Sequence, residues 1–234
     1  MRKASKNICY RCGQPKTSME HFPPKAFFPK GGNLQLKTVP SCVAHNSDKS
    51  KDDTYILTHI CLHAANGDNL PKRVFQHSIL PALKRSTGFP NLMNEGAEWL
   101  AGCARRYPVD LERFDSWFDG LVHAIFFDRF GFPLSSGTHY LSHTYLSFVS
   151  EEPAHQLEVA FARNMTSKFF CDYAAMVSRF EAAKIDEAVY ACDILDPGGA
   201  NASITIAHIF YGMFEVVSWL TRLPPNQLLA AEAQ

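Results

Sequence analysis

Four residues near the N-terminus have the types and spacing of a tetrahedral metal site. Cys9 and Cys12 form a C-x-x-C pair, and Cys42 and His45 form a C-x-x-H pair after 29 intervening residues. Each short spacing directs two ligand atoms toward one ion, as in structural zinc sites. The N-terminal segment that holds these ligands has few large apolar residues, so it needs a bound ion or a cross-link to fold. We therefore expect a structural Zn²⁺ here. The alternatives to His45 as the fourth ligand are two later histidines, His59 and His63.

The cysteine content and the N-terminal residues indicate a reducing compartment. The chain has seven cysteines, an odd number, and its basic N-terminus lacks the apolar core of a signal peptide. In such a chain a C-x-x-C pair indicates reduced thiols rather than a disulfide framework. No stretch approaches the roughly 18 apolar residues of a membrane span. We therefore expect a cytoplasmic protein without a membrane partner.

An acid, a histidine and an asparagine lie between and directly after the two ligand pairs. Glu20 and His21 are adjacent, and adjacent side chains on a strand point to opposite faces. One can hold a divalent cation while the other accepts a proton from water, and phosphodiester hydrolysis requires both tasks. Asn46 follows the second pair and offers an oxygen ligand, which the zinc would hold in place relative to Glu20 and His21.

The order of these residues resembles the HNH endonuclease family. A C-x-x-C pair, an acid-His-x-x-Pro sequence, a Gly-Gly stretch and C-x-x-His-Asn-x-x-Lys follow one another within about residues 6–56. The resemblance implies a ββα-metal fold, with structural zinc on the four Cys/His positions. It makes His21 the general base that activates water. It also makes Glu20 and Asn46 the ligands of a catalytic Mg²⁺ or Mn²⁺, with Asn46 at the head of the family's short helix.

The same resemblance assigns further positions. Lys49 lies one turn into the predicted helix, suited to a phosphate contact, and Lys25 is a second substrate-binding candidate. Asn33 corresponds to the asparagine that orients the base histidine. The family more often has Asp at the position of Glu20 and Cys at the position of His45. Neither difference removes a donor atom, so we expect an active site.

Charge is distributed unevenly along the chain. The 23 Lys and Arg residues cancel the 23 Asp and Glu residues, but residues 1–51 hold ten basic and two acidic side chains. The N-terminal segment therefore carries +8, and residues 52–234 carry −8. Basic side chains neutralise phosphates, so DNA is the expected substrate. RNA cleavage and nicking of duplexes stay open, and no pattern of a sequence-specific DNA reader is visible.

A non-enzymatic function is the competing interpretation. A zinc module that only binds nucleic acid or protein would keep the four ligands and the basic segment. It would not require Glu20, His21 and Asn46 together, so their presence favours the enzyme. Asp52 and Asp53 follow the motif directly and are candidates either to support the metal site or to join a helix end to the rest of the chain.

The composition changes near residue 66. We expect an HNH module over residues 1–66 and an acidic body over residues 67–234. An acidic surface does not favour DNA, so the body is expected to bind a protein partner or a second copy. HNH proteins with an extra domain are often the cutting component of an anti-phage defence system or a mobile element, which is the role that the resemblance implies.

Periodicity predicts the elements of the body. Residues 110–130 have the apolar spacing of an amphipathic helix, with Asp110 as N-cap and Gly131 as its end. Two β-branched, apolar runs flank a Pro-Gly-Gly turn and predict a hairpin. The fold class is therefore α+β: a small zinc-stapled module, then a larger, mostly helical α+β domain with a C-terminal hairpin. The other predicted helices lie at residues 72–85, 154–168 and 171–183.

Overall fold

The structure is a computed structural model and describes residues 7–29, 36–46, 50–64, 69–85, 97–100, 104–170 and 189–224, together with residues 88, 91 and 95. In chain order its elements are β1 (Ser18–His21), η1 (Lys25–Phe27), β2 (Thr38–Ser41), α1 (Val43–Asn46), α2 (Ser50–Ala64), α3 (Asn69–Val74), η2 (Phe75–Ile79), α4 (Leu80–Arg85), β3 (Glu98–Leu100), β4 (Ala104–Arg106), α6 (Leu111–Phe130), β5 (His139–Tyr145), α7 (Pro153–Phe170), β6 (Tyr190–Leu195), η3 (Gly199–Asn201), β7 (Ile204–Phe210) and β8 (Phe214–Arg222). The α+β class is confirmed. Three predicted features, the helix over residues 171–183, Asn33 and Lys49, lie outside the described residues.

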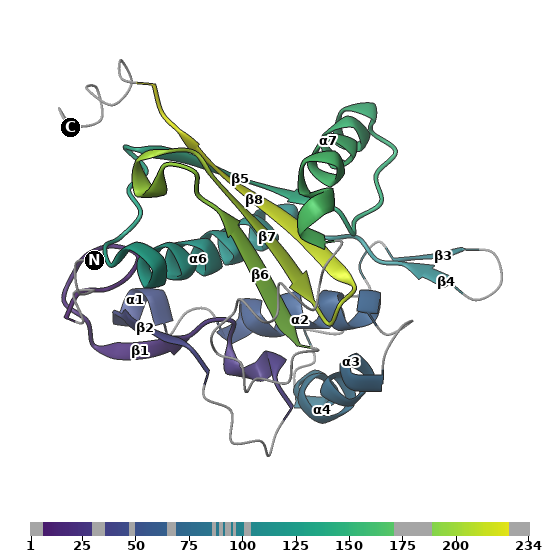
Figure 1. The fold of residues 1–234 in the computed structure, drawn as a ribbon. Coiled ribbons are helices and arrows are strands. Elements are labelled where there is room, and N and C mark those ends of the chain that lie inside the picture. The colour runs from purple at the N-terminus through teal and green to yellow at the C-terminus, as the bar shows by residue number, and fades with distance from the viewer. Residues whose placement is uncertain are drawn as a thin grey trace.

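The N-terminal part is a two-stranded hairpin followed by helices. Strands β1 and β2 are antiparallel, with Ser18 opposite Ser41 and His21 opposite Thr38. The short helix α1 follows β2 directly, and α2 comes next (Figure 1). Side chains around most of the circumference of α2 are buried, because this helix packs against η1, α3, η2, α6 and β8. The order of two strands and a helix implied by the resemblance is therefore present.

Helix α6 is the longest helix described, and local signals define both of its ends. The Asp110 carboxylate accepts a hydrogen bond from the Arg113 backbone N–H at 3.1 Å, which satisfies an otherwise unpaired donor of the first turn. At the other end Gly131 adopts a left-handed conformation with φ of 82°, which costs glycine little because it has no Cβ. The predicted cap and end of this helix are confirmed.

A four-stranded antiparallel sheet with the order β5-β8-β7-β6 covers one side of α6 (Figure 1). The β6–β7 pair confirms the predicted hairpin, and a short turn at residues 211–213 then leads into β8. Alternate residues of β8 face α6, and Val217 and Trp219 lie on the opposite face with α7. Helix α7 confirms the prediction over residues 154–168, and the helices from α3 to α4 confirm the one over residues 72–85.

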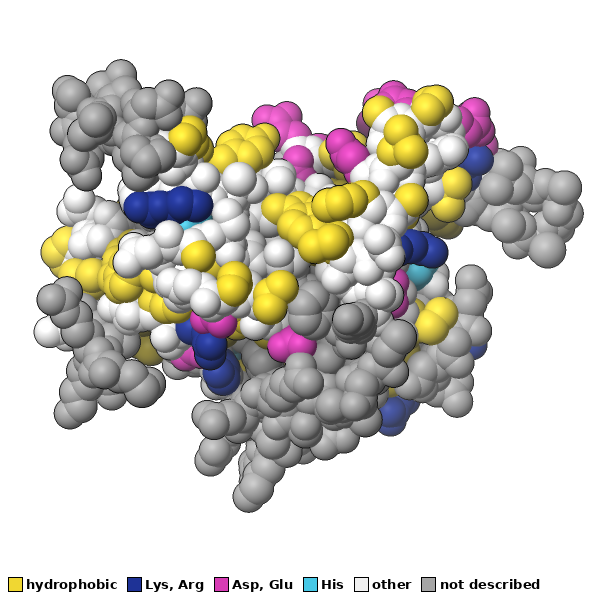
Figure 2. Space-filling view, turned by 45° about the horizontal axis from the view of Figure 1, so that its top comes forward, with side chains coloured by type: hydrophobic (Ala, Val, Ile, Leu, Met, Phe, Trp, Pro, Cys, Tyr) yellow, Lys and Arg dark blue, Asp and Glu magenta, His cyan; other side chains and the backbone are white. Residues whose placement is uncertain are grey.

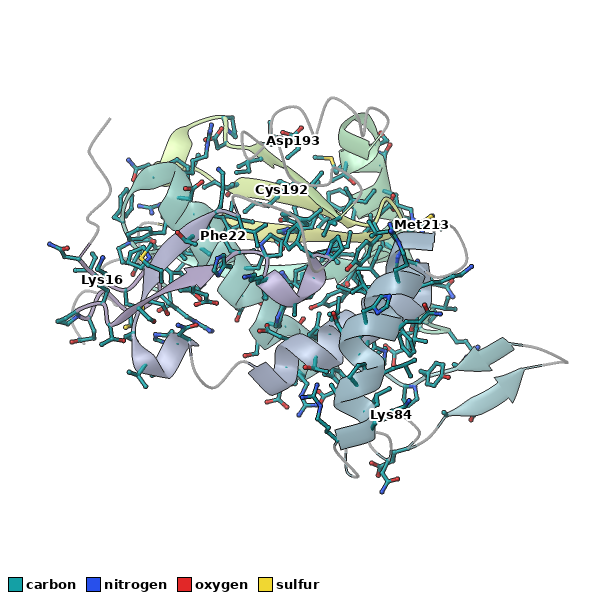
Figure 3. The ribbon with its side chains drawn as sticks, turned by 90° about the horizontal axis from the view of Figure 1, so that it is seen from below. Lys16, Phe22, Lys84, Cys192, Asp193 and Met213 are labelled. Carbon is teal, nitrogen blue, oxygen red and sulfur yellow. The ribbon has the colours of Figure 1, made fainter. Side chains whose placement is uncertain are left out.

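The N-terminal hairpin and the body share one hydrophobic core. Phe27 stacks on Trp117 of α6, with ring centroids 5.3 Å apart, and its backbone carbonyl accepts a hydrogen bond from the Tyr211 hydroxyl at 2.7 Å. Viewed from below, Phe22 lies in the middle of the molecule and Lys16 lies at the outer edge of the hairpin (Figure 3). The boundary between residues 66 and 67 stays a prediction, and the core continues across it.

The outer surface of α7 combines acidic and apolar side chains. Glu151, Glu152 and Glu158 are exposed at its start, and Figure 2 shows acidic side chains along the upper edge of the molecule. Leu157 and Phe161 lie one turn apart and are 72% and 60% exposed. Among the helices that the structure describes, none has the length and apolar character needed to cross a membrane.

Candidate functional site

The two predicted ligand pairs come together in space. The ligand atoms of Cys9, Cys12, Cys42 and His45 all lie within 4.8 Å of one another. Nδ1 of His45 is 3.3 Å from Sγ of Cys42 and 3.5 Å from Sγ of Cys9, and the Sγ atoms of Cys12 and Cys42 are 3.8 Å apart. Ligands about 2.3 Å from a central ion are separated by about 3.7 Å in a tetrahedron. These four residues, the cysteine–histidine cluster, can therefore hold a metal ion.

His45 is the histidine of this cluster. The two alternatives lie in α2 and contact aromatic rings instead. His59 packs edge-on against Tyr55, with ring centroids 4.5 Å apart, and His63 packs against Phe214 at 5.6 Å. Burial lowers the pKa of His59 to about 4, so its imidazole is neutral at physiological pH. Neither ring belongs to the group of ligand atoms that the structure brings together.

A tight turn of the backbone forms the first half of the cluster. The Gly13 N–H donates to the Cys9 carbonyl at 3.0 Å, and Gly13 has φ of 72°, a conformation that favours glycine. The Tyr10 N–H donates to the Pro40 carbonyl at 2.8 Å, which attaches this turn to β2. The second half starts where β2 ends, so the hairpin holds both halves together.

The backbone also prepares the Cys9 sulfur to act as a ligand. Burial alone would raise the pKa of the Cys9 thiol, but backbone N–H groups of Cys12, Arg11 and Cys42 lower it overall. Burial raises the pKa of Cys12. The N–H groups aimed at Cys9 stabilise a thiolate, and the thiolate is the form that binds metal.

Glu20 of β1 and Asn46 of α1 each contact a serine on one face of the hairpin. The Ser41 hydroxyl donates to the Glu20 carboxylate at 3.3 Å, and the Asn46 side-chain N–H donates to the Ser18 hydroxyl at 2.7 Å. Ser18 and Ser41 are directly opposite in the β1–β2 register, so the two serines connect the two candidate ligands. Burial raises the pKa of the Tyr10 phenol, and a hydrogen bond with Glu20 raises it further. Two hydroxyl groups thus orient the Glu20 carboxylate.

His21 is next to Glu20 at the end of β1 and belongs to the alternate face of the strand. It lines a small recess together with Glu20 of the same strand, Asp53 of α2 and Trp117 of α6. The recess has about 10 Å³ of free space, which is about the room of one water molecule. Lys25 is exposed in η1, and the substrate-binding role assigned to it stays a prediction.

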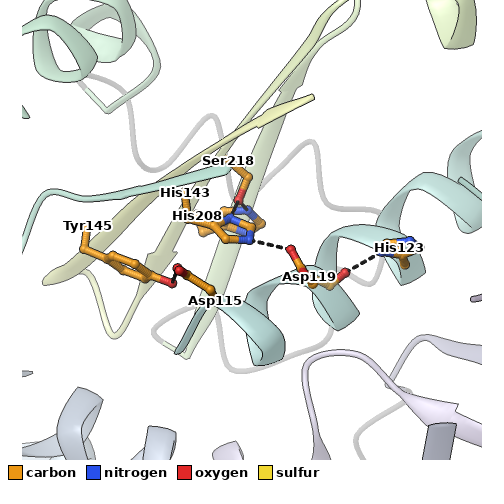
Figure 4. A network of polar contacts seen from close by, with 7 residues as sticks. All are labelled: Asp115, Asp119, His123, His143, Tyr145, His208 and Ser218. Carbon is orange, nitrogen blue, oxygen red and sulfur yellow. Dashed lines mark hydrogen bonds and ion pairs between the residues drawn. The ribbon is translucent and has the colours of Figure 1, made fainter. Parts of the chain in front are cut away.

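A second polar cluster, which no sequence motif indicated, lies between α6 and the sheet (Figure 4). Asp119 Oδ1 is 3.0 Å from His143 Nε2, whose Nδ1 is 2.8 Å from the Ser218 hydroxyl. Ser218 is also 3.0 Å from His208 Nε2, and His208 Nδ1 is 2.9 Å from the Tyr190 hydroxyl. We call these five residues the sheet network.

The first three residues of the sheet network have the connectivity of a Ser-His-Asp triad. However, Ser218 and His208 are fully buried, and burial lowers the pKa of His208 to about 3. A nucleophile must be reached by its substrate, and Ser218 is closed off by the core. The network is therefore part of the packing. The sequence signal that could have indicated it is a histidine in the apolar strand β7, which must find a buried partner.

No protein-family model, curated protein or solved structure matches this chain. The fold and the site define an α+β protein in which three cysteines and a histidine can hold a metal ion beside a hairpin that carries an acid and a histidine.

Proposed function

We propose that this protein is a metal-dependent HNH endonuclease that hydrolyses phosphodiester bonds in DNA. The observation that supports this most is that Glu20 and Asn46 each contact a serine on one face of the β1–β2 hairpin. The same hairpin carries His21 next to Glu20 and anchors the cysteine–histidine cluster. A module that only bound nucleic acid would have no need for this arrangement.

The metal of the cysteine–histidine cluster is proposed to be a structural Zn²⁺. Three sulfur atoms and one imidazole nitrogen form a common structural zinc ligand set, and soft thiolates favour Zn²⁺ over Mg²⁺ or Ca²⁺. Four protein ligands complete the tetrahedron and leave no position for water. A zinc ion held in this way stabilises the fold and does no chemistry itself, so a second ion is needed for catalysis.

The proposed ligands of the second ion are Glu20 and Asn46. A carboxylate oxygen and an amide oxygen are hard ligands, and Mg²⁺ is often bound by one or two such groups plus water and substrate phosphate. The Asn46 nitrogen donates to Ser18, which identifies the amide oxygen as the atom available for the cation. When bound, a divalent cation would stabilise the negative charge that develops on the leaving oxygen.

His21 is the proposed general base. A ring nitrogen of His21 takes a proton from water, and the water oxygen forms a bond to phosphorus. The bond from phosphorus to the leaving sugar oxygen breaks, and that oxygen takes a proton from solvent. A positioned general base contributes about 10²- to 10⁴-fold to the rate. Tyr10 and Ser41 orient the Glu20 carboxylate throughout.

Cleavage assays with purified protein test the proposal. We expect plasmid cutting with Mg²⁺ or Mn²⁺ and none in EDTA, with linear duplex, single-stranded DNA and RNA as parallel substrates. His21→Ala should abolish cutting and retain zinc, while His77→Ala, at an exposed position on η2, should cut normally. Cutting by His21→Ala at the normal rate would overturn the assignment of the base. Binding of DNA without cleavage of any substrate would favour the non-catalytic zinc module.

A further inference from the structure

The recess beside His21 contains a charged residue for which the proposed mechanism so far has no role. Asp53 lies in the first turn of α2 and lines this recess with His21 and Glu20. We propose that Asp53 is a positioning residue for His21, with its carboxylate accepting a hydrogen bond from the ring N–H directly or through one water. This inference rests on the proposed function and adds a residue to its machinery.

The Asp53 carboxylate is held by a rigid neighbour. The indole N–H of Trp117 donates to Asp53 Oδ1 at 2.8 Å, and Trp117 is only 5% exposed. The indole stacks on Phe27 and meets Phe118 edge-on, with ring centroids 5.0 Å apart in the second pair. A packed ring has little rotational freedom, so its N–H fixes the direction of the carboxylate. Asp53 is thus preorganised in the wall of the recess.

The neighbouring acid points elsewhere and provides the comparison. Asp52 forms an ion pair with Arg113 of α6 at 3.0 Å and does not line the recess. Consecutive residues of a helix project about 100° apart, so the two carboxylates face different surroundings although they are adjacent in the chain. Of these two acids, only Asp53 lines the recess of the proposed base.

A carboxylate at this position meets a chemical requirement of the mechanism. A histidine that accepts a proton from water at one ring nitrogen must carry the hydrogen on the other nitrogen, and a carboxylate acceptor selects that tautomer. It also stabilises the imidazolium that forms when His21 takes the proton. The free space of about 10 Å³ in the recess leaves room for a single bridging water.

The decisive variant is Asp53→Asn, because asparagine keeps an oxygen for the Trp117 N–H and replaces the other oxygen, the proposed acceptor for His21, with an uncharged NH2 donor. We expect kcat for plasmid cleavage to fall by about 10- to 100-fold, part of what a general base contributes, with KM unchanged. Asp52→Asn is the matched control and should retain kcat. Asp53→Glu should regain part of the lost rate. Trp117 fluorescence and the melting temperature check that the fold is intact.

The outcomes separate this inference from the function on which it rests. A wild-type protein that cleaves no nucleic acid overturns the proposed function. Wild-type cleavage that is lost in His21→Ala but unchanged in Asp53→Asn overturns only the role of Asp53. A raised KM with normal kcat would make Asp53 a substrate-binding residue and also overturn the inference. If Asp53→Asn does not fold, Asp53→Glu decides between a positioning role and a structural role. A loss confined to kcat in Asp53→Glu supports the positioning role, because a merely structural role predicts no such loss.

Discussion

Two clusters in the described part of the chain combine histidine with other polar side chains, and they differ in how their atoms are paired. In the sheet network each contact can pair one donor with one acceptor. His143 Nε2 donates to the Asp119 carboxylate and its Nδ1 pairs with the Ser218 hydroxyl, while neutral His208 pairs with Ser218 at Nε2 and with Tyr190 at Nδ1. These roles follow from the network as a whole. The network needs no ion, because each contact already pairs a donor with an acceptor. Its role is therefore to specify how α6 packs against the sheet.

The cysteine–histidine cluster has the opposite property. Its four ligand atoms face one another, and three of them are sulfur atoms that are weak donors and acceptors. The Sγ atoms of Cys12 and Cys42 are 3.8 Å apart, and two thiolates at this distance repel one another unless a cation lies between them. The difference shows that residue type does not distinguish a structural cluster from a metal site. The balance of donors and acceptors distinguishes them.

Loss of the metal should have the largest effect. Structural zinc supplies on the order of 10 kcal/mol in small modules, so Cys42→Ala should lose zinc and unfold the hairpin region. Elemental analysis should find about one zinc per wild-type chain, and hydrogen exchange should show loss of protection over β1 and β2. Cys192→Ala, at a buried cysteine outside the cluster, should retain zinc. Full zinc content in Cys42→Ala would show that the cluster is not the metal site.

Breaking the sheet network should destabilise the fold without affecting the metal. Ser218→Ala removes the hydroxyl between His143 and His208 and leaves two buried ring nitrogens without a partner. Each unpaired buried group costs about 1–3 kcal/mol, so we expect a loss of about 2–4 kcal/mol in urea unfolding. Half-buried Ser142 on β5 gives the control, and Ser142→Ala should change stability little. Loss of cleavage with the fold intact would make the network part of an active site.

His59 is a third type of histidine, because it is buried and its Nε2 has no hydrogen-bond partner among the residues that the structure describes. Burial lowers its pKa to about 4. The unfolded chain therefore binds a proton below pH 6.5 that the folded chain does not, and the free energy of unfolding falls as pH drops from 6.5 toward 4. The slope for one group is about 1.4 kcal/mol per pH unit.

His59→Phe should remove this loss and also the unpaired nitrogen. We expect it to stabilise the protein by about 1 kcal/mol at pH 7 and by about 2 kcal/mol more at pH 5. Urea unfolding of both proteins at pH 7, 6 and 5 measures the difference, and any loss of zinc at low pH is common to both. A difference that did not grow as the pH was lowered would show that His59 is protonated in the folded protein.

The parts predictable from sequence are those that local spacing determines. Two C-x-x pairs identify the cysteine–histidine cluster, and Asp110 and Gly131 mark the ends of α6 because caps involve only neighbouring residues. The sheet network depends on the β5–β8 register that places His143 opposite Ser218, and on the docking of α6 against the sheet. The position of Asp53 beside His21 likewise depends on how α2 packs. Such contacts join residues far apart in the chain, and no spacing pattern reports them.

The smallest effect is expected where the two regions meet at the surface. Lys37, which precedes β2, pairs with Asp128 of α6 at 2.8 Å, and the side chains are 29% and 39% exposed. Solvent screens a pair with this exposure, so Lys37→Ala should lower the free energy of unfolding by less than about 1 kcal/mol, and by less still in high salt. Urea unfolding at two salt concentrations measures this. A loss above about 2 kcal/mol that salt did not reduce would mean that this contact, rather than the shared core around Phe27 and Trp117, holds the β1–β2 hairpin against the body.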